Sequence, residues 1–386
     1  MARPRAKGNG EGTLYKRPDG RWCGQYVVGW VGGKPRRITV VADTKHEADR
    51  LLSAKKRDHA EGRLAPPQRQ TLAEYVAWWL ANVAANRLRP RTLQSYERTL
   101  ALHCLPYLGG LRLQQLAPRD LQTLYAERLA SGAGARTVQY LHAVLHRALH
   151  DAERLEMVGR NAADRADPPQ VEREEAPTLD LEQGRALLAA VRDTPAEGLV
   201  ALALLTGLRQ GELLGLRWSD VDWTVPQIAV QRTLSWVLGR GPICVPPKSK
   251  NSRRLVPLVP QAVEALRRAR IRQNEQRLAA GPEWQDGDLV FSTRSGRPLS
   301  PRNVRRDWFG PALERAQLPP VRFHDLRHTA ASLLLSLGVA LTTVQRILGH
   351  ANIGITADTY GHLLPGMATE AMRLYGEALS ADELQQ

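Results

Sequence analysis

Cysteine is scarce in this sequence, and its scarcity narrows the possible folds and compartments. Cys23, Cys104 and Cys244 are the only cysteines among 386 residues. They are widely spaced, odd in number and form no CxxC pair, so the sequence predicts neither a disulfide framework nor a zinc cluster. A reducing compartment, the bacterial cytoplasm, fits this pattern.

Long hydrophobic runs are also missing. The longest apolar stretches, such as Leu199 to Leu205, fall far short of the roughly 20 residues that a membrane-spanning helix needs. No signal peptide opens the chain. We therefore expect no membrane partner.

Acidic residues are outnumbered by basic ones. Asp and Glu total 39 against 54 Lys and Arg, which gives a formal net charge of +15 at pH 7 and a pI near 10.2. Such a charge attracts polyanions, so nucleic acid is the first partner to consider, although an inert basic surface has the same composition. Hydrophobic residues make up 43% of the chain, enough for buried cores. The length predicts two or three domains.

The first predicted domain, residues 1–65, combines a small sheet with a helix. Three short runs, GTLYKR, WCGQYVVGW and RRITVV, are separated by turns at Pro18-Asp19-Gly20 and Gly32-Gly33, which predicts a three-stranded antiparallel sheet. A helical pattern follows, with Thr44 as its N-cap. Six basic residues near the strands and turns favour DNA binding over a protein contact. They are Lys16, Arg17, Arg21, Lys34, Arg36 and Arg37.

Prolines divide the rest of the chain into two further predicted domains. Pro66 and Pro67 open the second, residues 66–170, where a capping box at Thr71 begins an all-helical region. Its further helices are expected at 92–105, 118–130 and 135–155. The third domain, residues 171–386, has helices at 181–191 and 199–216, strands at 227–237, 243–246 and 255–258, and then helices up to Glu377. The predicted fold class is therefore multidomain and mainly α with small β-sheets.

Five short motifs follow one another in the third domain. They are LLTGLRQGELLGLRW around Arg209, PPKSKNSRR around Lys248, HDLRHTAAS with His324 and Arg327, LGH ending at His350, and TADTYGH with Tyr360. In this order and setting they resemble the catalytic set of the tyrosine recombinase family, the phage integrases. The resemblance extends over nearly the whole chain. It implies an arm-type DNA-binding domain, a helical core-binding (SAM-like) domain and a mixed α/β catalytic domain.

Two arginines of these motifs are candidates for phosphate binding. Attack on a phosphodiester concentrates charge on its non-bridging oxygens, so catalysis depends mostly on positioning and electrostatic stabilisation. A guanidinium is always charged and binds phosphate oxygens in pairs. We assign Arg209 and Arg327 to this task. Arg209 follows Thr206-Gly207, where the apolar helix from Leu199 is expected to end and the chain to turn, so its side chain is expected at a helix junction. Glu212 either orients Arg209 by pairing with it or forms an ordinary surface pair.

Histidines accompany the arginines. His324 and Arg327 are spaced i and i+3, which places them on one helical face, able to address one phosphate. His328 is expected to point elsewhere and to be structural. His350 resembles the family's second histidine, a donor to the phosphate, whereas its position at the end of a helix favours a cap on general grounds.

Lysine is rare in this chain. Only eight lysines stand beside 46 arginines, and after Lys56 the sole ones are Lys248 and Lys250. An arginine cannot release its proton at working pH, whereas a lysine can be tuned to do so, as a general acid must. We assign Lys248, in a β-hairpin loop, to protonation of the leaving 5′ oxygen. Composition does not separate it from Lys250, but the PPK context favours it by resemblance.

Tyr360 is the candidate nucleophile. A phenol with a pKa of about 10 is ionised only about one part in a thousand at pH 7, so it needs neighbouring cations or a base. A covalent 3′-phosphotyrosine conserves the bond energy of the cut strand, so a free 5′ hydroxyl can rejoin it without ATP. Asp220 and Asp222 in WSDVDW lack the companion ligands of a two-metal site, and this motif is interpreted as a turn with packed tryptophans. No metal and no cofactor are expected.

The resemblance implies a site-specific DNA recombinase that integrates or excises a mobile element such as a prophage. The implied partners are double-stranded DNA at attachment and arm sites, and a homotetramer on two DNA sites that passes through a Holliday junction. A host DNA-bending protein or an excision factor is a further partner of such enzymes.

Two alternative functions are a DNA-binding accessory protein and a type IB topoisomerase. The intact motifs argue against the accessory protein, and the arm-like domain argues against the topoisomerase. The amphipathic segment from Met367 to Leu379 docks on a neighbouring subunit or folds back in cis.

Overall fold

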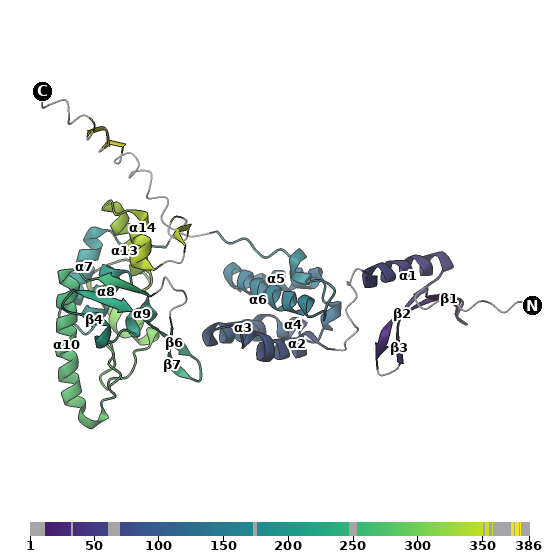
Figure 1. The fold of residues 1–386 in the computed structure, drawn as a ribbon, viewed down its shortest axis with the longest axis horizontal. Coiled ribbons are helices and arrows are strands. Elements are labelled where there is room, and N and C mark those ends of the chain that lie inside the picture. Colours follow the sequence, from purple (N-terminus) through teal and green to yellow (C-terminus); the bar gives the residue numbers. More distant parts are fainter. Residues whose placement is uncertain are drawn as a thin grey trace, which may run out of the picture. The chain divides into compact units, whose positions relative to one another are not determined.

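The computed structural model describes residues 12–31, 34–60, 70–172, 176–246 and 253–349, together with 352–354, 357, 372, 373, 375–377 and 379. The chain divides into two units, Met1–Glu172 and Arg173–Gln386. Figure 1 labels the helices and strands of each. No helix within the described ranges is both long and apolar enough to cross a bilayer.

The N-terminal part of the first unit is the predicted sheet with its helix. Strands β1 (Thr13–Lys16), β2 (Trp22–Val31) and β3 (Lys34–Ala42) pair antiparallel in the order β1-β2-β3, and α1 (Lys45–Ala60) packs on β2 and β3. The Thr44 hydroxyl accepts a hydrogen bond from the Glu47 backbone N–H at 3.2 Å, which confirms the predicted N-cap. Cys23 and Leu52 are buried between sheet and helix.

The second part of this unit is a helical domain. Its elements are α2 (Leu72–Trp79), a π-helical turn (Leu80–Ala84), α3 (Pro90–His103), α4 (Leu105–Leu108), α5 (Pro118–Ala130) and α6 (Ala135–Arg154). The capping box at Thr71 is confirmed, since its hydroxyl accepts from the Glu74 N–H at 3.2 Å and the Glu74 carboxylate accepts from the Thr71 N–H at 2.8 Å. Trp79 lies in the core and donates to buried Asp151 at 3.0 Å.

The second unit is built around one apolar helix. Helix α8 (Glu197–Thr206), in which every residue except Leu205 is buried, contacts its neighbours α7, α10 and α13. A sheet of order β4-β5-β8 and a separate β6-β7 hairpin complete the domain. The other elements are α7 (Leu181–Val191), α9 (Gln210–Leu214), β4 (Val221–Asp222), β5 (Gln227–Val230), β6 (Thr233–Val237), β7 (Gly241–Val245), β8 (Arg254–Pro257), α10 (Pro260–Ala280), α11 (Pro301–Asn303), a π-helical stretch (Val304–Phe309), α12 (Gly310–Arg315), α13 (Asp325–Ser336) and α14 (Leu341–Leu348).

Two expected elements are divided in the structure. The helical stretch expected over 199–216 is divided at Gly207, which has a left-handed φ of 62° and confirms the turn predicted at Thr206-Gly207. A Cβ at this position would lie 2.6 Å from the Leu348 side chain, so glycine permits both the turn and the approach of α14. The strand expected over 227–237 is two strands in different sheets, β5 and β6.

Candidate active site

Arg209 is held at the start of a helix by a buried carboxylate. Because the chain turns at Gly207, Arg209 becomes the extended N-cap residue of α9. Glu212 accepts from the Arg209 backbone N–H at 3.0 Å and from its Nη1 at 2.9 Å. The Glu212 side chain is 3% exposed and that of Arg209 is 36% exposed. The predicted pairing is therefore confirmed, and it is an orienting contact that leaves the Arg209 side chain partly exposed.

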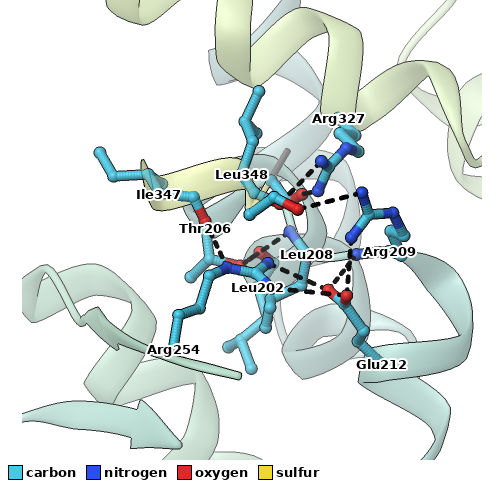
Figure 2. A network of polar contacts seen from close by, with 11 residues as sticks. Leu202, Thr206, Leu208, Arg209, Glu212, Arg254, Arg327, Ile347 and Leu348 are labelled. Carbon is cyan, nitrogen blue, oxygen red and sulfur yellow. Dashed lines mark hydrogen bonds and ion pairs between the residues drawn. The ribbon is translucent and has the colours of Figure 1, made fainter. Parts of the chain in front are cut away.

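Arg327 and Arg209 both bind the carboxyl end of α14. Arg327 is buried, and its two terminal nitrogens donate to Gly207 O at 2.8 Å and to Leu348 O at 2.7 Å. The Nη2 of Arg209 donates to the next carbonyl, Gly349 O, at 3.4 Å (Figure 2). The last carbonyls of a helix have no partner within the helix and carry partial negative charge, so cations are favoured there. The two arginines thus converge from α9 and α13 on one helix end.

A third arginine, which sequence reasoning missed, binds the same helix end. The Nε of Arg254, the first residue of β8, donates to Ile347 O at 2.6 Å, and its Nη2 donates to Glu212 at 3.0 Å. Three consecutive carbonyls, from Ile347 to Gly349, therefore accept from three different arginines (Figure 2). The signal available in the sequence is weak: within RLVP, Arg254 shares the inward face with buried Val256 and leaves Leu255 60% exposed.

His324 lies near both candidate phosphate ligands. It is the N-cap of α13, and its side chain remains accessible to solvent. Partial desolvation by the surrounding protein is the main cause that lowers its pKa, and the positive charges of His328, Arg327 and Arg209 lower this pKa further. Three of the six predicted catalytic residues, Arg209, His324 and Arg327, are therefore brought into one electrostatic environment.

The expectation that His328 points away from His324 is wrong. Its ring lies edge-on to that of His324, with the two centroids 5.5 Å apart. The reason is helical geometry, because residues at i and i+4 share a face as closely as residues at i and i+3. His328 consequently contributes to the charge environment of His324.

The lowered pKa values of His324 and His328 predict a loss of stability in mild acid. Both pKa values lie below the ordinary 6.5 in the folded chain, chiefly because the surrounding protein partly desolvates the two rings. As pH falls through 6.5 the unfolded chain takes up protons that the folded chain does not, so stability present above this pH is lost below it. We expect the melting temperature to drop between about pH 7.5 and about pH 5.5. The His324→Gln/His328→Gln double variant should show a smaller drop.

A matched control for this measurement is His46→Gln, which alters an exposed histidine on α1. It should retain the wild-type pH dependence. An equal drop in the double variant and in the wild type would refute the assignment of this linkage to the two active-site histidines.

Three predicted catalytic residues, Lys248, His350 and Tyr360, lie outside the described residues. Their described neighbours locate them along the chain. Lys248 lies between β7 and β8, which belong to different sheets. His350 directly follows Gly349, the left-handed residue (φ 67°) that ends α14 and binds Arg209. Of the segment from Met367 to Leu379, only 372, 373, 375–377 and 379 are described.

The six basic residues of the N-terminal sheet form two groups. Lys16, Arg17 and Arg21 lie at the end of the sheet where Lys16 pairs with Trp22, and Asp19 contacts Arg17 at 3.7 Å and Arg21 at 3.0 Å. Lys34, Arg36 and Arg37 are in β3, opposite residues 27–31 of β2. At about 3.3 Å per residue the groups are roughly 20 Å apart along β2. The side chains of Lys16, Arg17, Arg21 and Arg37 are exposed, and those of Lys34 and Arg36 are not described.

The acidic motif WSDVDW is structural, as predicted. Trp218 and Trp223 stack with centroids 6.3 Å apart, and Arg270 lies over both rings. Asp220 pairs with Arg232, and Asp222 accepts from the Thr224 N–H at 2.9 Å. Among the residues that the structure describes, no three His, Cys, Asp or Glu side chains are grouped so as to hold a metal ion.

Comparisons with known proteins give consistent matches. The model of the phage integrase family matches residues 177–366, and that of the phage integrase N-terminal SAM-like domain matches residues 71–129. An integrase of Streptomyces ambofaciens is 33% identical over 377 residues, which cover 93% of this chain and 94% of that protein. A XerC-like tyrosine recombinase of Caldanaerobacter subterraneus subsp. tengcongensis is 30% identical and covers 88% and 91% of the two chains.

Solved structures share the fold. The Tn1549 transposon integrase, in complex with circular intermediate DNA, superposes with a TM-score of 0.66 at 21% identity, covering 78% of this chain and 99% of that one. A λ integrase tetramer bound to a Holliday junction gives a TM-score of 0.54 at 17% identity, covering 92% and 97%.

Proposed function

The chain belongs to the phage integrase family of tyrosine recombinases, and we propose that it cuts and rejoins DNA through Tyr360. It is a site-specific DNA recombinase that acts in the integration or excision of a mobile element such as a prophage. One observation carries the proposed chemistry: Arg209 and Arg327 converge on the helix end that directly precedes His350.

The proposed reaction is a reversible phosphoryl transfer. The Tyr360 oxygen attacks phosphorus as its proton passes to a base, and the bond to the 5′ oxygen breaks with a proton from Lys248. His324 is suited to act as the base, because its lowered pKa keeps it neutral at pH 7. Arg209, Arg327 and His350 bind the non-bridging oxygens. Attack by the 5′ hydroxyl of another strand on the 3′-phosphotyrosine then releases the tyrosine.

We propose that this cycle needs neither a metal ion nor ATP. The guanidinium groups supply the positive charge that stabilises the phosphorane-like transition state. The phosphotyrosine bond conserves the energy of the broken phosphodiester. The same residues therefore catalyse cleavage and rejoining.

The proposed organisation has an arm-binding domain (residues 1–65), a core-binding domain (66–170) and a catalytic domain (171–386). We propose double-stranded DNA at attachment and arm sites as substrate, and a homotetramer on two sites as the active assembly. A λ integrase of the same fold forms such a tetramer on a Holliday junction, which supports this assembly. We propose that the protein acts in the bacterial cytoplasm, where such a DNA substrate lies.

DNA binding by the N-terminal sheet is open to direct measurement. If the β3 residues bind phosphates, the Lys34→Gln/Arg36→Gln/Arg37→Gln variant should bind arm DNA more weakly. The slope of log K against log salt should become shallower by about 0.9 for each phosphate that the variant no longer neutralises. The probe is a set of duplexes that tile the ends of the element.

The matched control for this variant removes three exposed charges of α1, in Arg50→Gln/Lys55→Gln/Arg57→Gln. This control should keep the wild-type salt slope. Equal slopes for both triple variants would contradict DNA binding through the sheet face.

A recombination assay tests the function itself. The protein is incubated with a plasmid that carries two copies of the attachment site, which is read from the DNA flanking the gene. Deletion or inversion between the sites is expected for a recombinase. Relaxation of a plasmid without these sites indicates a topoisomerase instead, and binding without strand cleavage indicates an accessory protein.

A further inference from the structure

We propose that Arg254 is a positioning residue of the recombinase, which sets the place of the Arg209 guanidinium without itself binding DNA. The proposal rests on the phosphate-binding roles proposed above for Arg209 and Arg327. Arg254 lies at the start of β8, and its side chain is only 7% exposed. Its guanidinium contacts the two structures that hold the phosphate ligands, Glu212 and the end of α14.

The first structure is the carboxylate of Glu212. It accepts from Arg209 on α9 and from Arg254 on β8, with nitrogen to oxygen distances of 2.9 and 3.0 Å. Burial raises the pKa of Glu212, but the charge of Arg254, and after it that of Arg209, lowers this pKa below its ordinary value. A buried carboxylate shared by two arginines leaves the cluster with a net positive charge. Without Arg254, Arg209 alone would neutralise the Glu212 carboxylate. The Arg209 guanidinium would then be drawn toward this carboxylate and away from the position in which it binds the phosphate.

The second structure is the carboxyl end of α14. Arg254 donates to the carbonyl of Ile347. The next two carbonyls along the chain, those of Leu348 and Gly349, accept from Arg327 and Arg209 respectively. A Cβ on Gly349 would lie 2.7 Å from Nη1 and 3.0 Å from Cζ of Arg254, so the guanidinium packs directly against this turn. Arg254 therefore supports the helix end at which both phosphate ligands are held.

Lysine cannot replace arginine at this position. Arg254 uses Nε toward α14 and its Nη nitrogens toward Glu212, so it spans two partners with one rigid planar group. The ammonium of lysine is a single point charge and reaches one of these partners at a time. The conservative variant Arg254→Lys thus keeps the charge and removes the bridge.

The chain contains a matched control. Glu197 is a buried carboxylate, 4% exposed, that is likewise shared by two arginines, Arg268 and Arg272 of α10. The variant Arg268→Lys makes the same chemical change at a buried carboxylate, but this pair joins α10 to α8, and the Arg268 side chain is 30% exposed. It reports the cost of altering a buried ion pair as such.

The test uses the full chain and two nicked duplexes of the attachment site. One has an ordinary phosphodiester at the scissile position, and the other has a methylphosphonate, which is neutral and depends less on guanidinium placement. We expect Arg254→Lys to form the covalent complex about 100-fold more slowly than wild type on the phosphodiester, as for a misplaced catalytic group. DNA affinity should be unchanged, and the loss should shrink on the methylphosphonate. Arg268→Lys should keep the wild-type rate on both substrates.

Other outcomes overturn the proposal in distinguishable ways. If Arg254→Lys loses the same factor in cleavage rate on both substrates, or if Arg268→Lys loses as much rate as Arg254→Lys does, Arg254 serves only the stability of the fold. A wild-type rate in Arg254→Lys shows that the bridge is dispensable. If wild type forms no covalent complex, or if Arg209→Lys cleaves as wild type does, the proposed function has failed, and the role of Arg254 fails with it.

Discussion

Tyr360→Phe is expected to abolish the covalent complex between protein and DNA while leaving DNA binding intact. In the proposed mechanism the phenolic oxygen forms the bond to phosphorus, and phenylalanine differs from tyrosine only in lacking this atom. Removal of a nucleophile from an assembled catalytic site costs on the order of 10⁶-fold in rate, which takes cleavage below detection. The measurement is a denaturing gel of the full chain with a nicked attachment-site duplex, in which the cut strand dissociates and the complex is trapped.

A control for this loss is Tyr375→Phe, which alters another tyrosine of the C-terminal region, 60% exposed in the structure. It should form the complex at the wild-type rate. A complex that persists in Tyr360→Phe would show that a different residue is the nucleophile. A mixture of the Tyr360→Phe and Arg327→Lys variants adds a second readout. If neither variant alone forms the covalent complex but the mixture does, one subunit supplies the tyrosine to the active site of its neighbour.

Lys248→Met is expected to slow cleavage by about 10²- to 10⁴-fold, the usual contribution of a general acid. The 5′ oxygen leaves as an alkoxide unless it receives a proton, and methionine has none to give. A substrate with sulfur in place of the bridging 5′ oxygen removes this need, because a thiol with a pKa of about 8.5 leaves readily as thiolate. The variant should therefore cleave the sulfur substrate at nearly the wild-type rate.

Lys250→Met is the matched control, two residues away in the same stretch. It should cleave both substrates as wild type does. If Lys250→Met is the slow variant that sulfur rescues, the general acid is Lys250. If sulfur rescues neither, lysine does not protonate the leaving group in this enzyme.

Local signals in the sequence were sufficient for many helices. Helices were expected at 118–130 and 181–191, and α5 and α7 have these bounds. At α5, Pro118 occupies the first turn and Asp120 accepts from the Ala117 N–H at 2.9 Å. At α7, the Asp180 carboxylate accepts from the Gln183 N–H at 2.8 Å, and the Gln183 side-chain oxygen accepts from the Asp180 N–H at 3.0 Å. Caps and helical periodicity involve residues at most four apart, so they can be read directly from the order of residues.

The same reasoning reached the family but only part of the site. The motif around Arg209 contains its partner Glu212 three residues on, so this pair was predictable. The role of Arg254 was not, because its partners Glu212 and Ile347 are 42 and 93 residues away in the chain. In the strand RLVP, moreover, an apolar residue such as Leu255 is expected on the buried face, but Leu255 is exposed and the charged Arg254 lies on the same face as buried Val256.

The sequence by itself thus determined most of the helices, the N-terminal sheet and the ordered motifs of a tyrosine recombinase, because each depends on residues that are close along the chain. Only the tertiary structure decided that β5 and β6 belong to different sheets and which carbonyls hold Arg209, Arg254 and Arg327. The physical reason is that a buried guanidinium must find acceptors to offset its desolvation. Those acceptors are brought to it by the packing of α8, α13 and α14, which join segments far apart along the chain.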